Sequence, residues 1–476
     1  MDEIIPKYSE WLTKFTFDNC AVGRKAYGEF LASYLVEEKD GFVLNLNGKW
    51  GTGKTEFLKR LYSHLHTQNH PVIYIDAWES DFTENPLLVV ASELLAQLKV
   101  LLPLHGNDLD KLTVFLGRLV KGTAIVAGSF IGEKLIQDGA AGREFVKSFM
   151  ESSPEDLLKT MKKGYSEQVE AVKDVRTQLE HLALALEEVH KRELPVMVLV
   201  DELDRCRPSY AIEMLEVIKH FFNTKNFVFV VATDTQQLEN SINAVYGEKF
   251  DSSVYLRRFF NRKAELSEPD IDYYLEKHNF TIASNIVLYP DKPAGITAST
   301  VAYHLAALVK AYNLDLRTVD QVIAKMKACL RTIARNEENR HAVNIFALLT
   351  AIIEFDERPE VFKGRADDKA LSEWKEADDF PMIDLDANRE TLFSGYYALN
   401  MKATVMHKKT QMDQTGDTIT QMVYSVNSSE CRVGNDASNM LRQTQNSIAN
   451  KMDSRQFTVW MWSDFKELVK LSKSFE

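Results

Sequence analysis

A glycine-rich segment that ends in lysine and threonine is the part of the sequence whose residue types and spacing most clearly indicate chemistry. Gly48, Gly53, Lys54 and Thr55 follow the pattern Gly-x4-Gly-Lys-Thr, between a short apolar run and a helical pattern. Glycines let the backbone curl, so that successive N–H groups point at a phosphate, and the following helix adds the positive end of its dipole. Lys54 would neutralise β- and γ-phosphate oxygens, and Thr55 would supply a hydroxyl to Mg²⁺. The alternative is a glycine turn with a structural role only.

Two carboxylates after a second apolar run fit the other half of such a site. A metal ion on a bound nucleotide has to be held from the side opposite the loop, which predicts an acid at the end of a distant buried strand. Asp201 and Glu202 directly follow the apolar run 196–200. We expect Asp201 to hold Mg²⁺ through water and Glu202 to orient and polarise the attacking water. Acids at strand ends also serve as helix caps, but the second carboxylate favours hydrolysis over nucleotide sensing alone.

Three further charged residues are candidates for contact with the terminal phosphate. Asp234 follows the apolar run 227–231, where a polar side chain could sense the γ-phosphate or position water, and its alternative role is a helix cap. Arg257 and Arg258 stand at the end of the same region. An arginine presented to the γ-phosphate of a neighbouring subunit stabilises transition-state charge. The alternative for this pair is a solvated surface or an ion-pair site.

Other clusters of functional residue types favour structural interpretations. Arg205 and Arg207 lie close to Asp201 in the chain and could brace its carboxylate or contact phosphate, but an internal salt bridge with Asp204 is the simpler expectation. Three histidines, among them His66 and His70 at i,i+4 spacing, follow the helix after the glycine-rich segment. No carboxylate or thiol accompanies them at metal-site spacing, which disfavours a metal site.

The elements that position these groups alternate between strands and helices. Strands that are apolar throughout and alternate with helices indicate a parallel sheet covered on both faces. We therefore predict an α/β fold, with a parallel-sheet core interrupted by a helical insertion and followed by an all-α lid and C-terminal domain. The strands are expected at 42–46, 72–75, 196–200 and 227–231, and the helices of the core at 27–37, 56–65, 86–102, 166–191 and 211–222.

Changes in pattern along the chain predict five segments. The core is expected to comprise 1–106 and 167–270, separated by a helical insertion at 107–166 with scattered glycines. A helical lid domain at 271–360 and a C-terminal helical or irregular domain at 361–476 follow. Helical patterns in these last two segments lie at 301–311, 318–336, 342–355 and 456–471.

The composition limits the possible partners and compartments. Asp and Glu number 69 against 57 Lys and Arg, which leaves a net charge of −12 and disfavours nucleic acid as a partner. The four cysteines form no CxxC pair, which speaks against a zinc ribbon or a disulfide framework and favours a reducing, cytoplasmic compartment. The longest apolar stretch, 123–131, is about half the length needed to cross a bilayer, so we expect no stable membrane insertion.

Taken together, the motifs resemble those of KAP-type P-loop NTPases, within the additional-strand ATPases related to AAA+ and STAND proteins. The resemblance covers about residues 18–266. Its carriers are Val22-Gly23-Arg24, Lys49-Trp50-Gly51 in the glycine-rich loop, Asp76-Ala77-Trp78 and the run Val200-Asp201-Glu202-Leu203-Asp204-Arg205-Cys206-Arg207-Pro208. Such proteins usually carry a helical, often membrane-spanning, insertion between the two nucleotide motifs, and residues 107–166 stand in that place. They commonly have Asn in place of Asp76, and they tend to have Glu-Lys in place of Arg257-Arg258. The last difference makes the arginine pair more similar to an AAA+ arginine finger.

The resemblance implies which residues bind the nucleotide and what the protein does. ATP and Mg²⁺ are the implied ligands, and Arg317 at the start of a lid-like helix is expected to reach the nucleotide or to form a surface ion pair. The binding residues that it implies are Gly23, Arg24, Gly48, Trp50, Gly51, Thr52, Gly53, Lys54, Thr55, Glu56 and Arg317.

The biological role that the resemblance implies is that of a homo-oligomeric ATPase component of a prokaryotic anti-phage defence or mobile-element system. The alternative is a nucleotide-switched scaffold that recruits an effector protein and turns over little ATP. A nucleic-acid translocase is a third possibility, which the acidic composition disfavours.

Overall fold

The computed structural model divides the chain into two compact units, Met1–Glu268 and Pro269–Glu476. It describes residues 7–82, 86–101, 173, 176–177, 179–188, 191–221, 224–292, 295–337, 339–365, 382–386, 389–392, 400–401, 404, 406–412, 418–424 and 457–471. The expected insertion at 107–166 lies outside the described residues. No helix in the described part is both long and apolar enough to cross a membrane.

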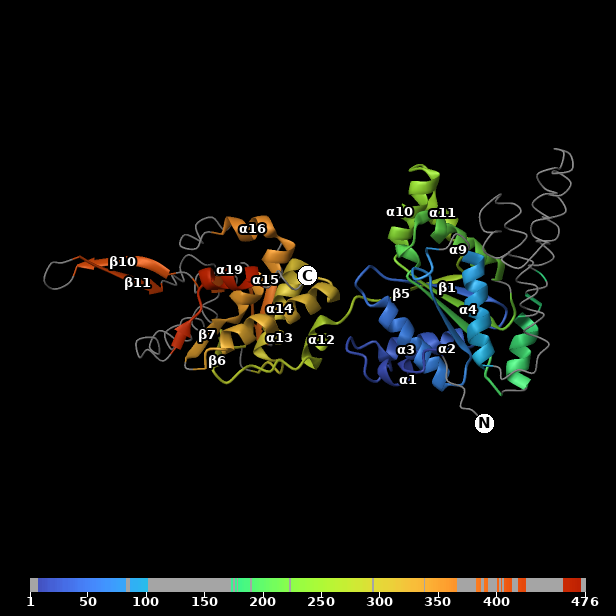
Figure 1. Cartoon of the computed structure of the whole chain (residues 1–476), viewed down its shortest axis with the longest axis horizontal. Helices are drawn as coiled ribbons and strands as arrows, with labels where there is room; N and C mark the ends of the chain where they lie inside the picture. Colours follow the sequence, from blue (N-terminus) through green and yellow to red (C-terminus); the bar gives the residue numbers. More distant parts are fainter. Residues whose placement is uncertain are drawn as a thin grey trace, which may run out of the picture. The chain divides into compact units, whose positions relative to one another are not determined.

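The first unit is built on a five-stranded parallel sheet in the order β2-β3-β4-β1-β5. Figure 1 labels β1 and β5 of this sheet, with helices beside them. The register places Asn47 beside Thr233 and Asp76 beside Asp201, so these four strands end at one edge of the sheet. The strands are β1 (Phe42–Asn47), β2 (Val72–Asp76), β3 (Val196–Asp201), β4 (Phe227–Thr233) and β5 (Arg262–Glu265).

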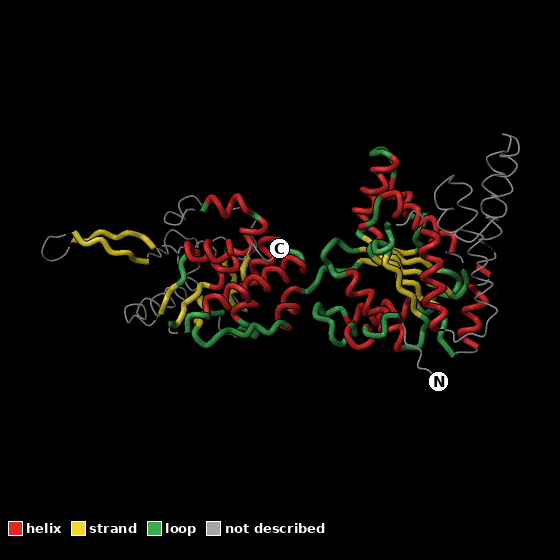
Figure 2. Tube along the Cα trace, in the orientation of Figure 1, coloured by secondary structure: helices red, strands yellow, loops and turns green. Residues whose placement is uncertain are grey.

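Helices cover both faces of this sheet, which explains why its inner strands are apolar throughout (Figure 2). Alternate residues along each strand join one of two cores. Leu44, Met197 and Val228 pack with helices α1 (Trp11–Lys14), α2 (Lys25–Leu35) and α3 (Lys54–Thr67). Val43, Val198 and Phe229 pack on the other face with helices α4 (Pro86–Leu101), α9 (Pro208–Phe221), α10 (Thr235–Tyr246) and α11 (Ser252–Leu256).

The α/β prediction is confirmed, and so is the additional strand that the resemblance implies. Strand β4 lies between β1, which leads into the glycine-rich loop, and β3, which ends at Asp201. The strand order brings the carboxyl ends of β1, β4 and β3 together in sequence across the sheet. Ligands of open parallel sheets bind beyond this edge.

The second unit is mostly helical, as expected, but it also contains a three-stranded parallel sheet in the order β12-β7-β6. The segment expected as one helix from 342 begins as strand, and its helix starts at Ile345, where Asn344 accepts the backbone N–H of Ala347 as a cap. The expected helix at 456–471 likewise begins as strand. The helices are α12 (Ile271–Lys277), α13 (Thr300–Tyr312), α14 (Leu316–Ala334), α15 (Ile345–Glu357), α16 (Pro359–Gly364) and α19 (Trp462–Leu471). The strands are β6 (Ile286–Tyr289), β7 (Arg340–Asn344) and β12 (Phe457–Val459), with antiparallel pairs β8 (Met382–Asp386) with β9 (Arg389–Leu392) and β10 (Met406–Met412) with β11 (Thr418–Tyr424).

Candidate nucleotide-binding site

The loop between β1 and α3 has a backbone that requires its glycines. Gly51 and Gly53 have φ angles of 80° and 84°, in the left-handed region that side chains with a Cβ rarely adopt. At Gly48 the constraint is space, because a Cβ there would lie 2.8 Å from the Oγ1 of Thr52. The N–H of Gly48 donates to the carbonyl of Thr233 at 3.0 Å, which ties the start of the loop to β4.

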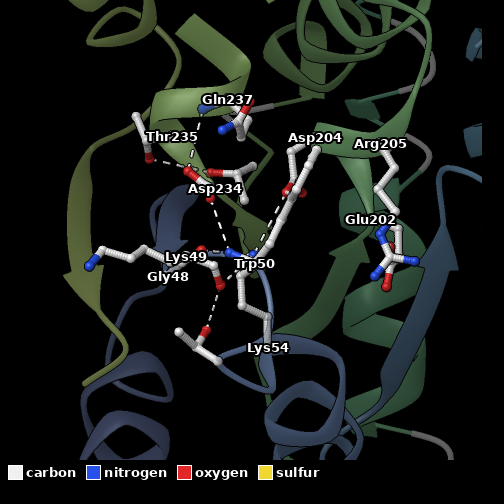
Figure 3. Close-up of polar contacts among 12 residues, drawn as sticks. Gly48, Lys49, Trp50, Lys54, Glu202, Asp204, Arg205, Asp234, Thr235 and Gln237 are labelled. Carbon is white, nitrogen blue, oxygen red and sulfur yellow. Dashed lines mark hydrogen bonds and ion pairs between the residues drawn. The ribbon is translucent and has the colours of Figure 1, made fainter. Parts of the chain in front are cut away.

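The ammonium group of Lys54 is turned back onto its own loop. Its Nζ donates to the carbonyl of Gly48 at 2.7 Å and lies 3.7 Å from the Oδ2 of Asp204. The same Oδ2 accepts the indole N–H of Trp50, so that Asp204 meets the loop at two points (Figure 3). The side chains of Lys54 and Asp204 are only 9% and 2% exposed. The positive charge of the loop is therefore balanced within the protein, and an anionic ligand has to compete with Asp204 for it.

The threonine of the loop meets the acid pair at the end of β3. The Oγ1 of Thr55 donates to the Oε1 of Glu202 at 2.9 Å, although 147 positions separate the two residues. The other oxygen of Glu202 is ion-paired with the Nε of Arg205, three residues along the chain. The phenol of Tyr74 donates to the Oδ2 of Asp201 at 2.8 Å. The two motifs identified in the sequence are thus in direct contact.

Asp201 is a fully buried carboxylate. Burial raises its pKa from 3.8 to about 6, with a further contribution from the neighbouring charge of Glu202, while the hydrogen bond from Tyr74 acts in the opposite direction. No lysine or arginine among the described residues forms an ion pair with it. A divalent cation beside Asp201 would supply the missing positive charge, and the oxygen donors of Thr55, Asp201 and Glu202 are of the kind that Mg²⁺ prefers.

Asp234 holds two backbone groups rather than standing free at the strand end. Its Oδ1 accepts the N–H of Gln237 as the cap of α10, and its Oδ2 accepts the N–H of Trp50 in the loop at 3.1 Å (Figure 3). The helix-cap alternative is therefore realised in the structure, together with a contact to the loop that the sequence did not indicate. The contact of Asp234 with the loop therefore depends on the position of the backbone N–H of Trp50.

The residues before α2 also contact the loop. The Nη1 of Arg24 donates to the carbonyl of Thr52 at 2.7 Å, and its Nη2 donates to the carbonyl of Ser267. Arg24 is only 5% exposed, and burial lowers the pKa of its guanidinium. Gly23, with a φ of 69°, makes the turn that brings Arg24 into this position. Glu56, in the first turn of α3, is ion-paired with Arg60 on the same helix.

The expected salt bridge between Arg205 and Asp204 is not formed. One turn of 3-10 helix, Leu203–Arg205, folds Arg205 back onto Glu202 instead, while Asp204 faces Lys54 and Trp50. Arg207 is ion-paired with Asp81 in the segment after β2. The prediction failed because consecutive side chains of a helical turn point in different directions. Arg205 and Asp204 are neighbours in the chain, but their side chains face different partners.

The remaining arginine candidates take no part in the contacts described above. Arg257 and Arg258 follow α11, are exposed, and make no ion pair or side-chain hydrogen bond with any other residue in the described part of the chain. Arg317 is exposed in the first turn of α14, in the second unit. The described residues include no cluster of three or more metal-ligating side chains, and His66 and His70 form none.

Two residues of the site were missed from the sequence. Tyr74 lies within β2 and resembles any other aromatic core residue until its hydroxyl is seen on Asp201. Asp204 had a usable signal, because it is the third acid in the run Asp201-Glu202-Leu203-Asp204. Its partner Lys54 becomes apparent only when the strand order is known.

Comparison with known proteins agrees with this geometry. A model of the KAP family P-loop domain matches residues 24–333, more than half of the chain. None of the curated proteins matches the chain. The matched region includes the glycine-rich loop, Asp201 and Glu202, whose side chains meet across the sheet edge. The chain therefore belongs to the KAP family of P-loop NTPases.

Proposed function

We propose that this protein hydrolyses ATP with Mg²⁺ at the edge of the sheet in its first unit. The observation that carries the proposal is the hydrogen bond between Thr55 and Glu202, because it joins the phosphate-binding loop to the acid pair. Family membership supports nucleotide binding and hydrolysis in general. The choice of ATP rests on the resemblance to related ATPases.

The residues have separate roles in this proposal. The N–H groups of the loop and the ammonium of Lys54 bind the phosphates, and Thr55 and Asp201 hold the metal ion. When bound, Mg²⁺ neutralises the charge that develops on the transferred phosphoryl group. Glu202 accepts the proton of the attacking water, a role that contributes about 10²–10⁴-fold in enzymes that use a general base.

The test is a phosphate-release assay with ATP or GTP, in the presence and absence of Mg²⁺. We expect Lys54→Ala to lose nucleotide binding. Glu202→Gln is expected to keep nucleotide binding and lose turnover by at least about 100-fold. Glu10→Gln, at an exposed glutamate directly before α1, is the matched control and should hydrolyse ATP at the wild-type rate. Full turnover by Glu202→Gln would refute the assignment.

A second candidate function is a nucleotide-switched scaffold that recruits an effector protein. The observation that favours it is that both carboxylate oxygens of Glu202 already have partners, which suits slow turnover. Tight retention of ATP with little phosphate release by the wild type would support the scaffold over the enzyme.

We also propose a homo-oligomer in which Arg257 or Arg258 completes the site of a neighbouring subunit. Both side chains are exposed and without an ion-pair partner in the described part of the chain, as an arginine that acts in a second subunit has to be. The mass of the protein in solution with and without ATP tests the assembly.

The proposed role in anti-phage defence rests on the resemblance alone. Phage plating on cells that carry the wild type or Lys54→Ala tests it.

A further inference from the structure

Glu202 is held in a position that is poorly suited to take a proton from water. Its Oε1 accepts from Thr55, its Oε2 is ion-paired with Arg205, and the side chain is only 13% exposed. A general base needs an oxygen within hydrogen-bond reach of the water that it deprotonates. The Oε2 of Glu202 is not open to that water while the guanidinium of Arg205 lies against it, and the Oε1 already accepts from Thr55.

The bond from Thr55 is compatible with hydrolysis, whereas the bond from Arg205 is not. A threonine hydroxyl donates one hydrogen bond and keeps lone pairs for a metal ion, so Thr55 can hold Glu202 and Mg²⁺ together. The guanidinium of Arg205 has only donors and no lone pair, so it cannot bind a metal ion while it pairs with Glu202. Release of Arg205 alone would free the Oε2 of Glu202 and leave its other contact in place.

Arg205 is built into this resting position by the local fold. Glu202 has a φ of 60°, which turns the chain sharply after β3, and the following 3-10 turn brings Arg205 back over it. The guanidinium also lies 5.7 Å from the ring centre of Trp78, a residue whose backbone N–H is held by Asp76 at 3.0 Å. The Arg205 side chain is 36% exposed, so it is free to leave Glu202 without unpacking the core.

We propose that Arg205 is a positioning residue that holds Glu202 in a resting state and thereby limits the rate of hydrolysis. The proposal rests on the proposed function, since it takes Glu202 as the general base. It gives a role to the ion pair between Arg205 and Glu202, which lies three residues before it in the chain. The rate-limiting event would then include the release of Glu202 from Arg205.

The test measures kcat and KM for Mg²⁺-ATP in variants of Arg205. Arg205→Ala and Arg205→Met should raise kcat about three- to fivefold, the factor that a partly exposed ion pair is worth, and leave KM within about twofold. Arg205→Lys keeps the charge and should stay near the wild-type rate. Arg207→Ala removes a neighbouring arginine that pairs with Asp81, and it serves as the matched control with unchanged kcat.

The outcomes separate this proposal from the proposed function. If Glu202→Gln abolishes turnover while Arg205→Ala and Arg205→Met show an unchanged or lower kcat, the resting-state role of Arg205 is wrong and the catalytic assignment stands. If Glu202→Gln turns over normally, the assignment of Glu202 fails first, and the proposal fails with it. If the wild type releases no phosphate, turnover must appear in Arg205→Met for the proposal to hold.

Discussion

Asp201→Asn tests the electrostatic cost of placing a carboxylate at the end of a buried strand. The fold raises the pKa of Asp201 from 3.8 to about 6 because it removes the carboxylate from water. A shift of about two pKa units corresponds to about 3 kcal/mol of differential stability between the protonated and ionised forms. Asn keeps the shape, and it can still hydrogen-bond with Tyr74 and the N–H of Glu202. The substitution should therefore stabilise the unit at neutral pH while it removes the metal-binding charge.

The sign and size of the effect depend on pH. A raised pKa in the folded state means that the native protein binds more protons than the unfolded chain, so the contribution of Asp201 to stability is greatest at low pH. That contribution is lost as the pH rises through about 6. Between about pH 5 and pH 7.5 the wild type should lose about 1 kcal/mol that Asp201→Asn does not lose.

Native-state hydrogen exchange of peptides from β3 and β4 is the suitable assay, because it reports on this unit separately from the second one. After correction for intrinsic rates, the protection gained by Asp201→Asn over wild type should be about tenfold larger at pH 7.5 than at pH 5. Asp40→Asn, at an exposed aspartate before β1, is the control and should show no such change. A gain that is equal at both pH values, or larger at pH 5, would refute the burial argument.

Three further predictions concern the metal, the arginine pair and the packing of α2. Chelation of Mg²⁺ with EDTA should abolish phosphate release, and added Mg²⁺ should restore it; turnover in EDTA would contradict the metal role of Thr55 and Asp201. Arg257→Glu and Arg258→Glu should keep ATP binding, measured by a nucleotide-binding assay, while at least one of them loses turnover; normal turnover in both would exclude an arginine finger. Gly28→Ala should destabilise the first unit by about 1–2 kcal/mol in denaturant unfolding, because overpacking outweighs the gain in helix propensity. Its new Cβ would lie 2.1 Å from the ring of Phe17, whereas Gly364→Ala, whose Cβ meets no atom within 4 Å, is the control.

Much of the first unit could be predicted because its signals are local. The apolar runs of the inner strands and the helices between them depend on residues that are neighbours in the chain. The expected strand at 42–46 is β1 (Phe42–Asn47), and the helix that follows the loop is α3 (Lys54–Thr67). In the second unit the local signal was weaker. There β6, β7 and β12 are only four, five and three residues long, and such short strands carry little alternation to detect.

By itself, the sequence determined the loop of Gly48, Gly53, Lys54 and Thr55 and the acids that follow a buried strand, because spacing alone specifies a backbone turn and a strand end. It did not determine which donors each acid meets. The contacts of Glu202 with Thr55 and Arg205, and of Asp204 with Lys54 and Trp50, depend on strand order, register and a single helical turn. All but the contact with Arg205, which a local turn forms, join residues far apart in the chain, so the tertiary structure decided which charges face one another across the site.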